Sequence, residues 1–216
     1  MMPLHVDCRM STSVIGRWSS FAVFLVGVAY FVALVSGFAT RGLSAPIVDP
    51  LLAVMEILTL IVAPVMLVMM AAIHARASGD RRAIGAAAFA FMALLTGVTS
   101  AVHFVELTAV RQLGSAALVW PSPAYALELL AWDVFLGLSL SLAAFTFDDN
   151  GRERRVRRGL LLCGAFCLFG AIGPLIGNMR LQLVGIFGYG VILPIVCLLL
   201  SRLFRADATA PGARVA

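Results

Sequence analysis

Four carboxylates lie inside long apolar runs of this chain: Glu56, Glu106, Glu128 and Asp133. An acid at the centre of a membrane helix costs roughly 2.5–3.5 kcal/mol on insertion scales. Acids in such positions usually face a bundle interior or a cavity, where they pair with cations, bind solutes or relay protons. His103 lies one helical turn before Glu106, so the sequence offers five candidate residues for a buried ionisable site.

The runs that carry these residues are long enough to cross a bilayer. The chain has 216 residues, of which 62% are hydrophobic and 12% charged, and its mean hydropathy is +1.01. Soluble domains are about 45–50% apolar, so the composition indicates a membrane protein. We predict an all-α fold, a polytopic membrane bundle of six transmembrane helices at about 21–38, 50–73, 83–110, 124–147, 159–176 and 181–203.

The regions outside the predicted spans are short. We expect an N-terminal segment over residues 1–18, a transmembrane domain over 19–204 and a tail over 205–216, frayed from about residue 206. The apolar run 19–40 exceeds the 7–15 residues of a signal-peptide core, so it is expected to remain as the first span. The connection 112–120 is long enough for a small interfacial helix.

The arginines predict the orientation. All sixteen basic residues are arginine, and thirteen of them fall on one side of the predicted topology. The other side has Arg41, Arg111 and Arg180. Both termini are therefore expected to be cytoplasmic. The net charge of +5 does not imply nucleic acid as a partner, because the arginines sit at span ends rather than in a basic domain.

Because successive spans run in opposite directions, the position of a residue in its span predicts its depth in the membrane. At 1.5 Å per residue, all four acids and His103 fall in the outer half of the membrane, with Asp133 deepest at about 15 Å. Glu128 and Asp133 point about 140° apart on an α-helix. Either their helix has neighbours on two sides, or one of these acids serves structure and the other function.

Polar residues on two other spans accompany the acids. Thr96, Thr99 and Ser100 share a helical face with His103 and Glu106, a stripe that could also serve as hydrogen-bonding glue between helices. Arg111 and Arg180 at the outer boundary could pair with the glutamates or lie at the mouth of a cleft. Gln182 and Tyr189 share a face that would suit a cleft wall or a close helix contact. The candidate ligand-binding set is Glu56, His103, Glu106, Arg111, Glu128, Asp133, Arg180, Gln182 and Tyr189.

Two kinds of chemistry receive little support. His103, Glu106 and a carboxylate from another span could supply three metal ligands, but di-iron bundles use Glu-x-x-His twice and this chain has His-x-x-Glu once. Cys163 and Cys167 are expected to pack as small apolar residues, and no zinc spacing is present. No Gly-x-Ser-x-Gly motif is present either. We therefore expect no metal and no cofactor, and the catalytic residues, if there are any, are not identified.

Three segments resemble a family of bacterial six-span membrane proteins that has no assigned activity. They are residues 103–108 (HFVELT), 126–140 (ALELLAWDVFLGLSL) and 177–190 (GNMRLQLVGIFGYG). The resemblance is strongest in the second half of the chain. It implies a multi-pass protein of the bacterial cytoplasmic membrane and no particular reaction.

Three functions remain open from the sequence. The first is binding or transport of a small solute or cation at the outer-half acids. The second is an intramembrane enzyme acting on a lipid or apolar small molecule, with an acid and His103 as proton shuttles. The third is a structural or sensory subunit in which the charges only pair. The expected partners are the lipid bilayer and a small solute, cation or lipid ligand, and the oligomeric state is left open.

Overall fold

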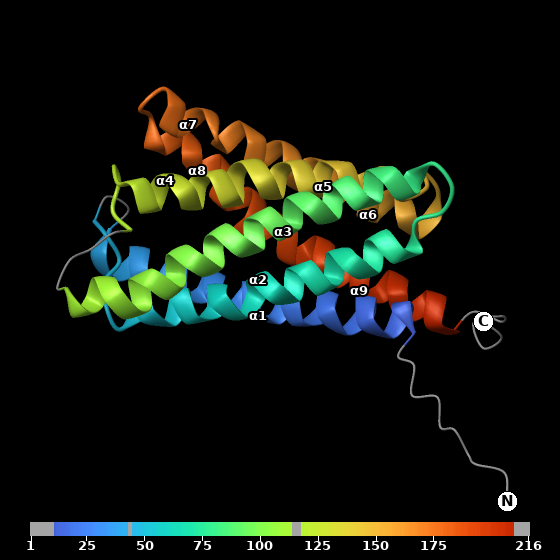
Figure 1. Cartoon of the computed structure of the whole chain (residues 1–216), viewed down its shortest axis with the longest axis horizontal. Coiled ribbons are helices and arrows are strands. Elements are labelled where there is room, and N and C mark those ends of the chain that lie inside the picture. The colour runs from blue at the N-terminus through green and yellow to red at the C-terminus, as the bar shows by residue number, and fades with distance from the viewer. Residues whose placement is uncertain (1–10, 43–44, 114–117, 210–216) are drawn as a thin grey trace, which may run out of the picture.

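The computed structural model describes residues 11–42, 45–113 and 118–209, and all regular structure in this part of the chain is helical. Within the described residues, six helical stretches are long and apolar enough to cross a membrane, which confirms the predicted all-α fold and the number of predicted spans (Figure 1). They are Thr12–Arg41, Leu51–Arg76, Arg81–Val110, Pro123–Ala144, Gly151–Leu175 and Met179–Thr209.

The first two stretches are single helices, α1 (Thr12–Arg41) and α2 (Leu51–Arg76). The other four change geometry along their length. The third is α3 (Arg81–Val105) continued by the π-helical segment η1 (Glu106–Val110), and the fourth is α4 (Pro123–Leu129), η2 (Leu130–Phe135) and α5 (Leu136–Ala144). The fifth is α6 (Gly151–Gly170) with α7 (Ile172–Leu175), and the sixth is α8 (Met179–Phe187), η3 (Gly188–Ile192) and α9 (Leu193–Thr209).

Local signals explain where the helices begin and turn. The side chains of Ser11 and Ser122 accept hydrogen bonds from the backbone N–H of Val14 and Tyr125, so each caps a helix N-terminus. Gly177 has φ +72°, a conformation that suits glycine, and it closes the tight turn between the last two spans. Because Ser11 caps α1, this helix begins nine residues before the predicted start of the apolar span.

The predicted interfacial helix over 112–120 is wrong for its described C-terminal part. The chain bends at residues 118–120 instead, directly before Pro121, and the residue before a proline is disfavoured in the α conformation. Residues 114–117 lie outside the described part of the chain. So do residues 1–10 of the expected N-terminal segment and 210–216 of the expected tail, whereas α9 continues to Thr209.

The six spans pack as a bundle whose neighbours are not all sequential. Helix α1 packs on α2 and α9, α3 packs on α2 and α5, and α6 packs on α5, α8 and α9. Large, fully buried side chains fill the interior on the side of the chain termini, including Met66, Met69, Met92, Leu136 and Phe147. Buried serines such as Ser20 and Ser139 occur in this half too, whereas the buried acids lie in the other half.

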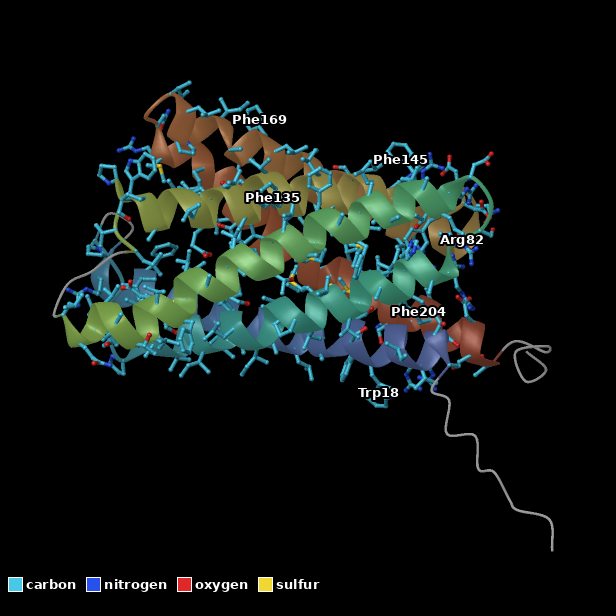
Figure 2. The ribbon with its side chains drawn as sticks, in the orientation of Figure 1. Trp18, Arg82, Phe135, Phe145, Phe169 and Phe204 are labelled. Carbon is cyan, nitrogen blue, oxygen red and sulfur yellow. The ribbon has the colours of Figure 1, made fainter. Side chains whose placement is uncertain are left out.

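The two ends of the bundle differ in charge. The start of α1, the α2–α3 and α5–α6 turns and the end of α9 lie together at one end, seen on the right of Figure 1. Figure 2 places Arg82 at this same end. The arginine-rich connections therefore gather at one end of the molecule, as the predicted alternation of six spans requires.

Candidate functional site

A cavity of about 890 Å³ occupies the half of the bundle away from the chain termini. Side chains of α1, α2, α3, α4, η2, α8, η3 and α9 line it together with the connections near residues 46 and 119, and most of them are apolar. Six of the nine candidate site residues belong to its wall: Glu56, His103, Glu128, Arg180, Gln182 and Tyr189. Glu106, Arg111 and Asp133 are not among the lining residues.

Glu128 is the centre of a hydrogen-bonded group on the cavity wall. Its Oε2 atom accepts hydrogen bonds from the Thr99 hydroxyl at 2.8 Å and the Trp132 indole N–H at 2.9 Å. His103 Nε2 lies 3.2 Å from the same oxygen, which makes an ion pair when the imidazole is protonated. The other carboxylate oxygen, Oε1, is buried and has no hydrogen-bond partner among the described residues.

Helix geometry brings these four residues together. Thr99 and His103 are four residues apart on α3, and Glu128 and Trp132 are four residues apart across α4 and η2, so each pair shares a helical face. The two faces oppose each other because α3 packs on α4 and η2. The predicted polar stripe of α3 therefore reaches the site through Thr99 and His103, while Thr96 donates to the carbonyl of Ala63 on α2.

A second group of charged side chains joins the N-terminal end of α2 to the C-terminal end of the third span. Arg111 Nη2 lies 2.9 Å from Glu56 Oε2 and 2.8 Å from Asp49 Oδ1, and Arg111 Nε donates to Asp49 Oδ2 at 3.1 Å. Partial burial lowers the pKa of Arg111, but these carboxylates outweigh the burial and raise it above its ordinary value. Glu56 is fully buried, and its Oε1 atom has no hydrogen-bond partner in the described structure.

Asp133 lies behind the cavity wall, against the last two spans. The Gln182 amide points to Asp133 Oδ2 at 3.4 Å and to the Tyr189 hydroxyl at 3.2 Å. Gly185 of α8 and Gly170 of α6 leave room for the carboxylate, because a methyl group at Gly185 would overlap Asp133 Oδ1. Asp133 is fully buried, and Oδ1 is without a partner among the described residues.

The fourth span therefore has neighbours on two sides, one of the two arrangements predicted from the 140° separation of its acids. Glu128 contacts Thr99 and His103 of α3, whereas Asp133 contacts Gln182 of α8. Glu106 is buried as well, but it does not line the cavity. Among the described residues it makes no contact with Asp133 or Gln182. Arg180 reaches the cavity rim and is exposed, and no carboxylate pairs with it in the described part of the chain.

Sequence reasoning missed several wall residues. Tyr30, Tyr125 and Trp132 add aromatic surface beside Tyr189, and the Trp132 and Tyr189 rings lie 5.3 Å apart between centroids. Tyr30 is a polar-tipped aromatic inside an otherwise apolar run, which was a usable signal. Asp49, the second partner of Arg111, was missed because it precedes the second span rather than lying within it.

No three metal-ligating side chains converge within residues 11–42, 45–113 and 118–209. The three-ligand set considered from the sequence is not assembled, because His103 contacts Glu128 on α4 and Glu106 is not part of that contact.

Comparison of the chain with protein-family models gave no match, and neither did comparison with curated proteins or with solved structures. The resemblance of three segments to a bacterial six-span family therefore stays a prediction. In the part of the chain that the structure describes, six helices are able to span a membrane, and ionisable residues are buried between them.

Proposed function

We propose that the protein is a multi-pass protein of the bacterial cytoplasmic membrane that binds a small amphipathic cation in the cavity and carries it across the bilayer. The observation that carries the proposal is the Glu128 carboxylate, which belongs to the wall of a large, mostly apolar cavity. One of its oxygens, the buried Oε1, has no hydrogen-bond partner among the described residues. A carboxylate oxygen in such a place is costly unless a ligand satisfies it.

The size and lining of the cavity fit a small organic ligand. Ligand pockets commonly measure about 300–1,000 Å³ and combine apolar walls with a few polar groups. Aromatic rings of Tyr30, Trp132 and Tyr189 beside Glu128 favour a cation, because ring faces attract positive charge. An apolar body on the same ligand would contact the aliphatic side chains of α1, α2 and α9.

The charges around the cavity also favour a positively charged ligand. Glu56 already contacts a cation, Arg111, which it shares with Asp49. Among the described residues, His103 is the only possible cationic partner of Glu128, and a neutral imidazole leaves the carboxylate uncompensated. A ligand cation would supply the missing charge.

The arginine distribution supports the orientation. Placing the arginine-rich end in the cytoplasm puts the cavity in the outer half of the bilayer, open toward the end that carries Arg180. A structural role is favoured only for Glu56, whose ion pair with Arg111 ties two helix ends together. That role is compatible with a ligand site centred on Glu128.

Glu128→Gln tests the proposal against a matched control. Tetrabutylammonium, an apolar cation, serves as the probe for stabilisation of the purified protein and for uptake into vesicles. We expect Glu128→Gln to weaken binding by about ten- to a hundredfold. The probe has no N–H group and is attracted by charge alone, which contributes roughly 2–3 kcal/mol at about 6–8 Å and an effective dielectric constant of about 20. Glu106→Gln makes the same chemical change in a buried acid that does not line the cavity, and it should bind as the wild type does.

Four results would contradict all or part of the proposal. Unchanged binding by a folded Glu128→Gln variant would show that this carboxylate does not contact the ligand. An equal loss in Glu106→Gln would point to a general effect of buried charge. Equal stabilisation by an uncharged analogue of the same shape would exclude selection for a cation. Binding without uptake would retain the site and reject the carrier.

A further inference from the structure

A second hollow lies at the opposite end of the molecule, between the first turns of α6 and the last turns of α9. It measures about 360 Å³ and is far from the cavity that contains Glu128. Four arginines line it, accompanied by smaller and aliphatic side chains: Arg152, Arg155, Arg202, Arg205, Leu199, Leu203, Ala206 and Thr209. We call this the arginine groove.

The helix geometry explains why the arginines converge. Arg152 and Arg155 are three residues apart on α6, and Arg202 and Arg205 have the same spacing on α9, so each pair shares a helical face. Gly159 brings the helices close, because a methyl group at this position would overlap Val196 of α9. All four arginines are exposed, which leaves their guanidinium groups available to a ligand.

Four carboxylates at this end of the molecule are engaged elsewhere. Glu153 and Asp207 both pair with Arg76 of α2. Asp148 pairs with Arg81, and Asp149 pairs with Arg154. Within the described residues no carboxylate pairs with any of the four groove arginines.

The groove is thus a concentration of like charge without a counter-charge. The positive end of the α6 dipole adds to it, because Arg152 and Arg155 lie in the first turns of that helix. Guanidinium groups bind phosphate oxygens through two parallel hydrogen bonds, which makes paired arginines well suited to phosphate.

We propose that the arginine groove binds the headgroup of an anionic phospholipid from the leaflet on this side of the membrane. The lining favours a lipid over a free anion, since Leu199 continues the groove along α9 toward the apolar middle of the span. This side chain would contact the first part of an acyl chain. Two arginine pairs suit a headgroup with two phosphates, so cardiolipin should bind more tightly than lipids with one phosphate.

Lipid titration of the delipidated, full-length protein, followed by native mass spectrometry, tests the proposal. Cardiolipin is compared with phosphatidylcholine of the same acyl chains and with inorganic phosphate. The variants Arg152→Gln/Arg155→Gln and Arg202→Gln/Arg205→Gln each remove one side of the groove. The control, Arg82→Gln/Arg158→Gln, removes two exposed arginines outside the groove and changes the net charge equally.

We expect each groove variant to bind cardiolipin at least about fivefold more weakly than the wild type, and the control to bind it normally. The groove arginines make no ion pair in the described structure, so thermal unfolding without added lipid should not change. An equal loss of cardiolipin binding in the control would show that general surface charge, and not the groove, causes the weaker binding. If phosphatidylcholine bound as tightly as cardiolipin, the proposed selectivity for anionic lipid would be wrong. If inorganic phosphate displaced cardiolipin at comparable concentration, the ligand would be a free anion and not a lipid.

Discussion

Arg111 contacts two carboxylates at once, the exposed Asp49 and the fully buried Glu56. Removing the guanidinium leaves Glu56 buried without a counter-charge. We expect Arg111→Gln to lower the free energy of unfolding by about 1–3 kcal/mol, the usual cost of an unsatisfied buried group. Glu56→Gln should cost less, because the amide that replaces the carboxylate is uncharged. Denaturation of the purified variants in one detergent measures both changes.

The double variant Glu56→Gln/Arg111→Gln separates pairing from other effects of these residues. If the pair is what matters, the double variant should be more stable than Arg111→Gln alone, because it no longer buries an unpaired charge. Strictly additive losses would show that Arg111 stabilises the protein through Asp49 or through packing instead.

Individual residues of the candidate site were predictable to different degrees. Acids inside apolar runs identified Glu56 and Glu128 at the cavity, because burial of charge is visible in composition. Depth alone also selected Glu106 and Asp133, which share the level of the site but do not line the cavity. The direction in which a side chain points depends on which helices pack together, and a single sequence does not contain that information.

At the scale of elements, three spans contain a π-helical segment close to the polar residues. Glu106 begins η1, Trp132 and Asp133 lie in η2, and Tyr189 lies in η3. A π-helical turn bonds residues five apart, so it changes which side chains share a face compared with an α-helix. The hydrophobic pattern predicted the spans themselves but not these segments, because a wide turn has no distinct composition.

Close approach of α6 and α8 depends on two glycines that face each other, Gly170 and Gly185. A methyl group at Gly185 would overlap the Asp133 carboxylate and touch Gly170, so we expect Gly185→Ala to destabilise the protein by about 1–3 kcal/mol, the usual cost of overpacking. Gly97→Ala is the matched control, because nothing lies within 4 Å of the added methyl group. This control should be neutral or slightly stabilising, since alanine favours a helix.

Thermal unfolding of the two alanine variants distinguishes specific packing from a general effect of helix glycines. Similar stability of the two variants would show that α8 can move away from α6 without cost. The Asp133 carboxylate would then be held by Gln182 rather than by a tight glycine contact.

At the scale of the whole molecule, the alternation of spans was the most predictable property. Six apolar runs separated by turn residues fixed the number of helices, and the positions of thirteen arginines predicted which connections lie at one end. The order in which the spans pack was not predictable. Helix α1 contacts α9, and this pairing closes the bundle around the cavity through side chains far apart in the sequence.

Cysteine labelling tests the proposed orientation. Three cysteines are buried and should not react with the label: Cys163, Cys167 and Cys197. Replacing the fourth, Cys8→Ser, therefore gives a background in which every remaining thiol is buried. In that background Leu113→Cys introduces a thiol at a position that is 79% exposed near the outer end of the third span, and Asp80→Cys introduces one in the α2–α3 turn. A membrane-impermeant maleimide should label Leu113→Cys in intact cells, and Asp80→Cys only after permeabilisation.

The reversed pattern would change both proposals in a defined way. The cavity with Glu128 would then open to the cytoplasm, and the arginine groove would face the outer leaflet. Labelling of both thiols from one side would contradict the crossing of the membrane by α3 itself. The expected pattern instead would place the cavity with Glu128 toward the outside and the arginine groove toward the inner leaflet, which is the orientation that both proposals require.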